Sequence, residues 1–138
     1  MMELFFIRYQ KYGTTILRIS LGLLFFIAGI TKVIDPSAVI SMVEAMGFPE
    51  PFNIYFGVLT MLSELVFGFT LLIGYNLKTS VIPLIIITIV ATIGVHLPNI
   101  DQGVMTIVII LLHLVTIAAL LSLAISGPGP LSIDRETE

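Results

Sequence analysis

The stretch that decides the fold is Asn53-Ile-Tyr-Phe-Gly-Val-Leu-Thr-Met-Leu-Ser-Glu-Leu-Val-Phe-Gly-Phe-Thr-Leu-Leu-Ile-Gly-Tyr75. It is long enough to cross a bilayer, because a spanning helix needs roughly 20 mostly apolar residues. Glu64 stands near its centre. A charged side chain at that depth costs about 2.5–3.5 kcal/mol on insertion scales. The chain must therefore neutralise Glu64, pair it with a cation, or place it beside water.

Composition places the whole chain in a membrane. Its 138 residues are 57% hydrophobic and only 11% charged, whereas soluble domains are about 25% charged. With no Cys in the sequence, disulfide and thiolate chemistry are excluded from the chain itself. The formal net charge of −3 and the lack of a basic run argue against a nucleic-acid partner. We expect one helical domain over residues 1–138.

The hydropathy pattern predicts an all-α membrane protein, a bundle of four transmembrane helices in contact with the lipid bilayer. The spans are expected at about residues 14–34, 53–75, 80–97 and 104–125, with a turn from His96 to Gly103. A signal peptide is the alternative reading of the first stretch, since Arg8 and Lys11 precede it. That run is too long for a simple signal-peptide core.

A short amphipathic helix is predicted in the first outer loop, over residues 35–47, lying on the membrane surface. Asp35 can cap it, Pro36 fits its first position, and Gly47 can end it. Residues 1–13 fit either an interfacial helix or a frayed terminus.

Lys and Arg counts set the orientation of a membrane protein, because cytoplasmic loops carry the excess. Four spans put both termini on one side. The side with the termini holds five Lys and Arg residues: Arg8, Lys11, Arg18, Lys78 and Arg135. The other side holds only Lys32. We therefore expect both termini in the cytoplasm.

Polar and small residues share helix faces within the spans, as a period of about 100° per residue shows. The first span aligns Arg18, Gly29 and Lys32, and the second aligns Glu64 with Gly68. Small residues of this kind let helices approach closely. The stripes predict where the spans meet.

Depth suggests which polar residues meet. Glu64 and His113 both lie about half-way across, so they are candidate partners, and Arg18 is long enough to reach toward Glu64. Lys32 and His96 fall at the outer edge. Each residue also has a purely structural reading: a charge pair or protonated carboxyl for Glu64, and an interhelical hydrogen bond for His113.

No metal site and no haem are predicted. Glu64 and His96 differ in depth by about 15 Å, too far for one ion to bind both. The two histidines are expected at different depths, which does not suit an axial pair.

Several blocks of this sequence resemble the DoxX family of bacterial membrane proteins. Residues 17–36 resemble the family's first-helix signature, with Arg18, Gly29 and Lys32 in register. Glu64 with Gly68, residues 95–99 and residues 127–134 resemble its later landmarks. The resemblance implies a four-helix protein of the bacterial cytoplasmic (inner) membrane. Related DoxD subunits belong to thiosulfate:quinone oxidoreductases. His113 matches no family motif.

These observations predict an integral membrane component of a redox system, a quinone-linked oxidoreductase subunit with a polar pocket centred on Glu64. Glu64 and His113 would exchange the protons of quinone chemistry. The expected ligand-binding residues are Arg18, Lys32, His96, Gly29 and Gly68. No flavin, haem or iron–sulfur motif is recognisable, so electrons would come from a redox partner protein or a bound substrate.

A non-enzymatic role is the alternative to a redox function. The bundle would then anchor a partner protein or bind a lipid or small molecule. A transporter ranks third, because four spans are few and no inverted repeat is evident, so that it would need to form a homo-oligomer.

Overall fold

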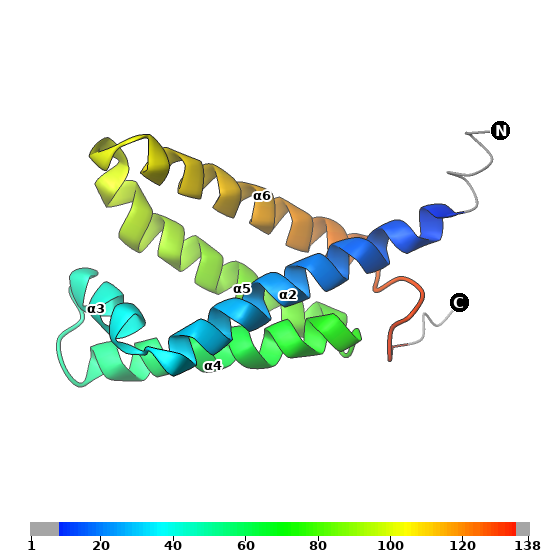
Figure 1. The fold of residues 1–138 in the computed structure, drawn as a ribbon, viewed down its shortest axis with the longest axis horizontal. Helices are drawn as coiled ribbons and strands as arrows, with labels where there is room; N and C mark the ends of the chain where they lie inside the picture. The colour runs from blue at the N-terminus through cyan, green and yellow to red at the C-terminus, as the bar shows by residue number, and fades with distance from the viewer. Residues whose placement is uncertain (1–8, 135–138) are drawn as a thin grey trace.

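The computed structural model describes residues 9–134 and is all-helical over that range (Figure 1). Four stretches are long and apolar enough to span a membrane: Gln10–Ile34, Phe52–Ile73, Leu77–Gln102 and Val104–Ser126. This confirms the all-α fold with four candidate spans. The first stretch joins a short 3-10 turn, η1 (Gln10–Tyr12), to α2 (Gly13–Ile34), and the second is α4 (Phe52–Ile73).

The third stretch is longer than the predicted span. Its α-helix, α5 (Leu77–Ala91), continues through a π-helical turn, η2 (Thr92–His96), and a 3-10 helix, η3 (Leu97–Gln102). His96 therefore lies inside the helical rod, whereas the sequence predicted that a turn begins there. The rod then reverses at Gly103 into α6 (Val104–Ser126).

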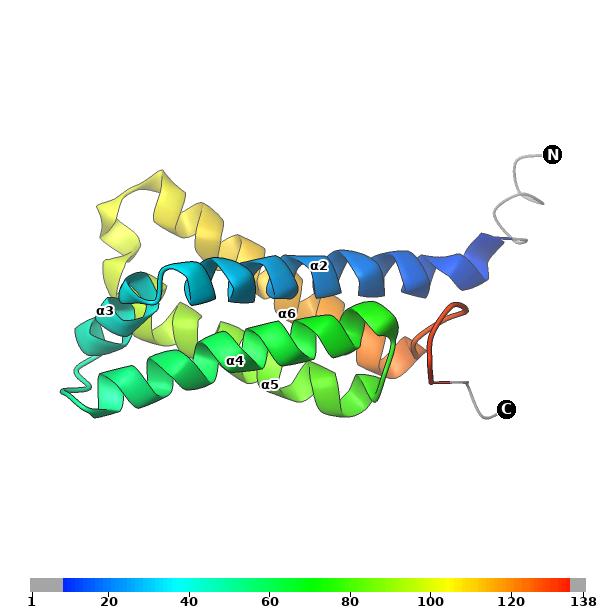
Figure 2. The same cartoon turned by 60° about the horizontal axis from the view of Figure 1, so that its bottom comes forward.

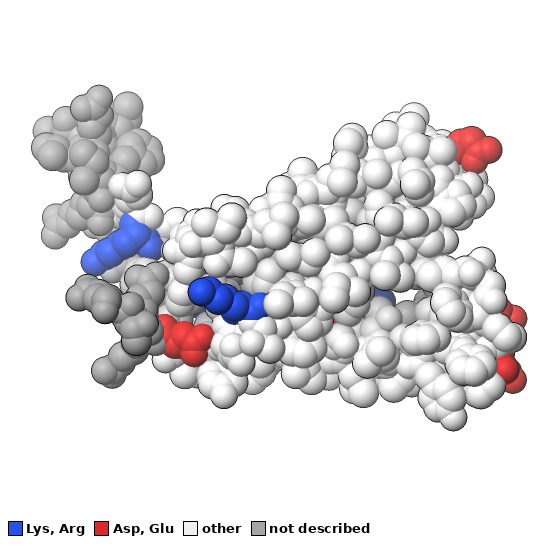
Figure 3. All heavy atoms as spheres, turned by 180° about the vertical axis from the view of Figure 1, so that it is seen from behind, with Lys and Arg blue, Asp and Glu red and all other residues white. Residues whose placement is uncertain are grey.

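Charged side chains gather at the two ends of the molecule (Figure 3). On the face drawn in Figure 3 the surface between them is mostly uncharged, as expected for a chain whose middle faces hydrocarbon. One end, here called the α3 end, carries α3 (Ser37–Ala45) and the reversal from η3 into α6. The other, the tail end, carries the α4–α5 turn and residues 127–134.

A short helix does occupy the first loop, but its N-cap residue is Pro36, whereas the sequence predicted Asp35 as the cap and Pro36 as the first helical residue. The Asp35 carboxylate accepts a hydrogen bond from the Ser37 N–H at 3.1 Å. Val39 and Val43 of α3 are buried, and Ile40 packs on Gly57 of α4. The helix therefore packs on the bundle. Its placement on the membrane surface stays a prediction.

α2 and α4 run side by side and antiparallel along most of their length (Figures 1 and 2). Glycines allow this approach. A Cβ built on Gly29 would lie 2.6 Å from the backbone nitrogen of Leu65, and one on Gly68 would lie 2.5 Å from that of Phe26. Real Cβ atoms do not come so close, so only glycine fits at both contacts.

The packed core lies toward the tail end, where helices α2, α4, α5 and α6 all contribute. Its members are Leu21, Phe25, Leu71, Leu77, Val81, Leu84, Leu120 and Leu123. α6 joins this core through Leu120 and Leu123 and is otherwise the least buried span: 6% of its most apolar window is buried, against 22–28% in the other three. α6 therefore leaves most of its surface without contact to the rest of residues 9–134.

We predict that Gly68→Ala lowers the free energy of unfolding by about 1–3 kcal/mol, because the added methyl group overpacks the α2–α4 contact. Thermal unfolding in mild detergent measures this as a lower melting temperature. Gly13→Ala is the control, since a Cβ there meets nothing within 4 Å. Equal melting temperatures for the two variants would contradict the proposed contact.

Candidate functional site

Glu64 is paired with Lys32. The Lys32 Nζ donates to Glu64 Oε2 at 2.5 Å, and the Glu64 side chain is only 8% exposed. Among residues 9–134 this is the one salt bridge. The glycine contact positions the pair, since Gly29 lies one turn before Lys32 and touches Leu65, the residue after Glu64. The expectation that Glu64 needs a basic partner is met, and that partner comes from α2.

Arg18 does not approach Glu64, although the sequence offered it as a partner. Its side chain is fully buried and donates to four backbone carbonyls. Two of them, Leu71 (2.9 Å) and Leu72, belong to the last turn of α4. The other two are Pro128 (3.0 Å) and Leu131 (2.8 Å).

The carbonyls of a final helical turn lack partners within the helix and carry the negative end of its dipole. The Arg18 guanidinium therefore satisfies the C-terminus of α4 and, through the same group, holds residues 127–134 against it. Four of its five N–H donors are used in this way. Arg18 has a structural role here, and a ligand-binding role for it stays a prediction.

Residues 127–134 form a strap across the tail end. The Thr15 hydroxyl donates to the Pro130 carbonyl at 2.5 Å. The Asp134 N–H donates to the Gly74 carbonyl, and the Asp134 carboxylate accepts from the Leu77 N–H at 3.2 Å, at the first residue of α5. The strap thus caps α4 and α5 together.

His113 is bonded to Thr92. The Thr92 hydroxyl lies 2.8 Å from His113 Nδ1 and also donates to the Thr88 carbonyl at 2.6 Å. A hydroxyl has one proton, so His113 Nδ1 must be the donor in this contact. A neutral His113 therefore carries its proton on Nδ1 and leaves Nε2 as an acceptor.

The two histidines meet, although the sequence placed them at different depths. Their ring centroids lie 5.1 Å apart with an interplanar angle of 71°. The reason is the extra length of the third rod, which continues beyond His96 to Gln102 before α6 returns. His96 and His113 thus form one polar cluster with Thr92, while Lys32 and Glu64 form another.

The sequence predicts ligand binding at Gly29 and Gly68. In the structure, the opposing helix occupies the space beside each glycine. The nearest atoms to their built Cβ positions are backbone atoms of Leu65 and Phe26. The contacts give both glycines a packing role, and ligand binding at either stays a prediction.

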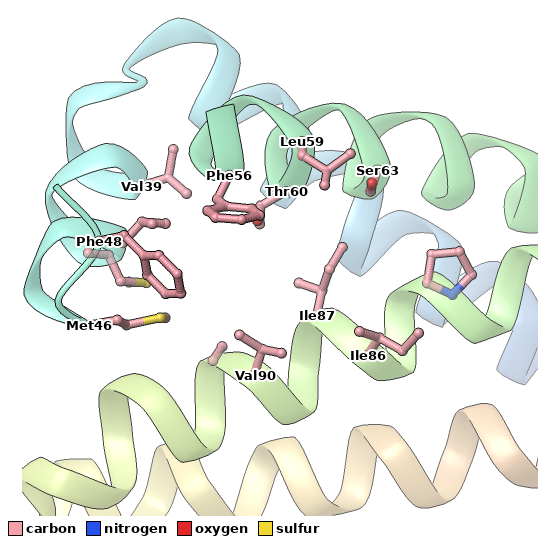
Figure 4. Close-up of a pocket in the computed structure, with 14 residues that line it drawn as sticks. Val39, Met46, Phe48, Phe56, Leu59, Thr60, Ser63, Ile86, Ile87 and Val90 are labelled. Atoms are coloured by element: carbon pink, nitrogen blue, oxygen red, sulfur yellow. The ribbon is translucent and has the colours of Figure 1, made fainter. Parts of the chain in front are cut away.

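An apolar cavity of about 480 Å³ lies between α3, α4 and α5 (Figure 4). The sequence did not single out its lining, and Glu64 is not part of it. The lining residues are Val39, Met42, Val43, Met46, Phe48, Phe56, Leu59, Thr60, Ser63, Pro83, Ile86, Ile87, Val90 and Ala91. Thr60 and Ser63 are its only hydroxyl-bearing members. Their spacing of three on α4 puts them on one helix face and was the available sequence signal.

The family model DoxX matches residues 13–97, from the start of α2 to the residue after η2. The chain belongs to the DoxX family. The matched region contains Lys32 and Glu64, together with every residue that lines the cavity, whereas His113 lies outside it. No curated protein and no solved structure matches this DoxX chain.

We predict that Arg18→Met destabilises the protein by at least about 3 kcal/mol, because it leaves buried carbonyls without a donor. The strap should loosen, so the amide hydrogens of Ile133 and Asp134, which are bonded to Ile73 and Gly74, should lose protection in hydrogen exchange.

The matched control is Lys78→Met, which removes a cation from an exposed site at the same end. Unchanged protection at both amides in Arg18→Met would show that the guanidinium does not hold the strap.

Proposed function

We propose that this DoxX-family protein is an integral membrane component of a quinone-linked redox system, with its proton-exchanging group at Glu64. The observation that supports this most is the Lys32–Glu64 pair, which lies between two apolar spans. A buried ion pair is a weak source of stability, because desolvation offsets its attraction. Glycine packing already joins α2 to α4. Ionisable groups inside a membrane are by default functional candidates.

The reaction that the proposed component takes part in is the interconversion of quinone and quinol. Reduction of a quinone consumes two electrons and two protons, and oxidation releases them. Glu64 accepts or supplies a proton while Lys32 balances its charge, and the ammonium group can donate to a headgroup oxygen. The His96–His113 cluster is the second candidate proton site, since His113 Nε2 is free to accept. Electrons are supplied by a redox partner protein.

The test is quinone-dependent turnover by the protein purified with its partner in mild detergent. Glu64→Gln keeps the size and hydrogen-bonding capacity of the side chain but cannot ionise, so turnover should fall by roughly 10²–10⁴-fold. Glu44→Gln, in the exposed face of α3, should retain full activity. Full turnover in Glu64→Gln would remove this carboxyl group from the mechanism.

A second candidate function is favoured by the apolar cavity. A non-enzymatic anchor that binds a lipid or small molecule needs such a site and needs no proton exchange. Under this function Glu64→Gln and the parent chain would retain the same partner on co-purification, and neither complex would turn over quinone.

We also propose that the tail end faces the cytoplasm of a bacterial cell and the α3 end faces outward. Support comes from the charges: Lys11 and Lys78 lie at the tail end, and the α3 end holds the acidic residues Asp35, Glu44, Glu50 and Asp101. Cationic loops are retained in the cytoplasm.

Because the chain has no Cys, single introduced cysteines report orientation directly. In intact cells, a membrane-impermeant maleimide should label Glu44→Cys, and it should label Lys78→Cys only after lysis. The reverse pattern would contradict the proposed orientation.

A further inference from the structure

The cavity between α3, α4 and α5 has the features of a ligand site. We propose that it binds a neutral, chain-bearing lipophile, and that Thr60 and Ser63 form hydrogen bonds to an oxygen of its headgroup. This inference rests on the proposed function, because that function makes a quinone the first ligand of this class to consider. It assigns the ligand's position to residues outside the Lys32–Glu64 pair.

The hydroxyl groups of Thr60 and Ser63 differ from those of several other threonines in the spans. Thr70, Thr88 and Thr116 each donate to a carbonyl of the preceding turn of their own helix. The side-chain hydroxyl groups of Thr60 and Ser63 form no hydrogen bond with any group of residues 9–134, and among the hydroxyl groups of the spans that lack such a bond these two line the cavity. A hydroxyl group without a partner in an apolar medium is costly, and lipid tails offer none. Both residues line the cavity (Figure 4), where a bound ligand can supply the partner.

The other lining residues favour an uncharged and largely apolar ligand. None of the lining residues is charged, so an anionic headgroup would enter without a counter-charge. Phe48 and Phe56 pack edge to face at 5.0 Å, and the flexible side chains of Met42 and Met46 lie beside them. Methionine adapts to irregular apolar shapes. A volume of about 480 Å³ lies in the usual range of roughly 300–1,000 Å³ for small-molecule sites.

The position of the two hydroxyl groups along α4 determines which end of the ligand lies deep in the membrane. Ser63 directly precedes Glu64, so it lies at nearly the depth of the ion pair, about 1.5 Å along the helix axis. The polar end of the ligand is therefore deep in the membrane. A phospholipid has the opposite arrangement, with its charged group at the surface. A quinone suits the site because a hydroxyl group can donate to the quinone carbonyl and accept from the quinol O–H.

The test is equilibrium binding to the full chain in detergent, with three probes that share a decyl tail: a benzoquinone, an alkyl ester and a plain benzene. The double variant Thr60→Val/Ser63→Ala removes both hydroxyl groups and little volume. It should weaken binding of the benzoquinone roughly ten-fold, the effect of losing two ordinary hydrogen bonds. Binding of the benzene probe should be weak and unchanged.

Two further variants serve as controls. Thr116→Val removes a hydroxyl group that already has a helix partner, and it should leave binding unchanged. Ala91→Phe fills the cavity without removing a core group, and it should abolish binding of every probe. A melting temperature near that of the parent chain shows that each variant is folded.

The outcomes separate this inference from the proposed function. Equal binding of the benzoquinone by the double variant and the parent chain overturns the inference, even if turnover depends on Glu64. Equal binding by Ala91→Phe also overturns it. Binding of the ester but not of the benzoquinone, with loss in the double variant, supports the inference and contradicts the quinone-linked function.

Discussion

The hydrocarbon of a bilayer contains no water, so every charge and every free backbone group placed there must be satisfied by protein atoms. Two buried charged side chains in this DoxX-family protein meet that demand in different ways. Glu64 takes a cation from the neighbouring span. Arg18 takes four carbonyl oxygens and, among residues 9–134, no carboxylate. Each solution fixes the position of one helix relative to another.

The Arg18 network joins the spans to the strap at the tail end. It closes the end of α4 and holds the strap, whose Asp134 in turn caps α5. The same half contains the apolar core. Toward the α3 end, no comparable network of residues 9–134 joins α4 to α5, and the cavity lies between these helices. The bundle therefore has its hydrogen-bonded network and apolar core at the tail end and its cavity toward the α3 end.

Much of the fold could be predicted from the sequence, because the signals were local. Runs of apolar residues marked the spans, and the glycine stripe marked the face of α2 that meets α4. The depth of Glu64 alone required that it be neutralised, paired with a cation or placed beside water. The identity of that cation depended on side-chain reach: Lys32 was expected at the membrane edge, yet its long stem extends to Glu64.

The remaining features could not be predicted, because they depend on backbone groups and on lengths that a sequence does not display. Carbonyls are present at every residue, so nothing marked those that bind Arg18. The meeting of His96 with His113 required the unexpected continuation of the third rod to Gln102. The cavity is lined mostly by residues that, in sequence, resemble lipid-facing ones, and the spacing of Thr60 and Ser63 alone did not mark a site.

The central claim is that Lys32 is the group that makes a buried Glu64 tolerable. A double-mutant cycle in thermal unfolding tests it most directly, with Lys32→Met, Glu64→Leu and the double variant compared with the parent chain. The account predicts that Lys32→Met lowers the melting temperature more than the double variant does, because it leaves a carboxyl group without its cation. If the changes in melting temperature of the two single variants simply add up in the double variant, the pairing of Lys32 with Glu64 is contradicted.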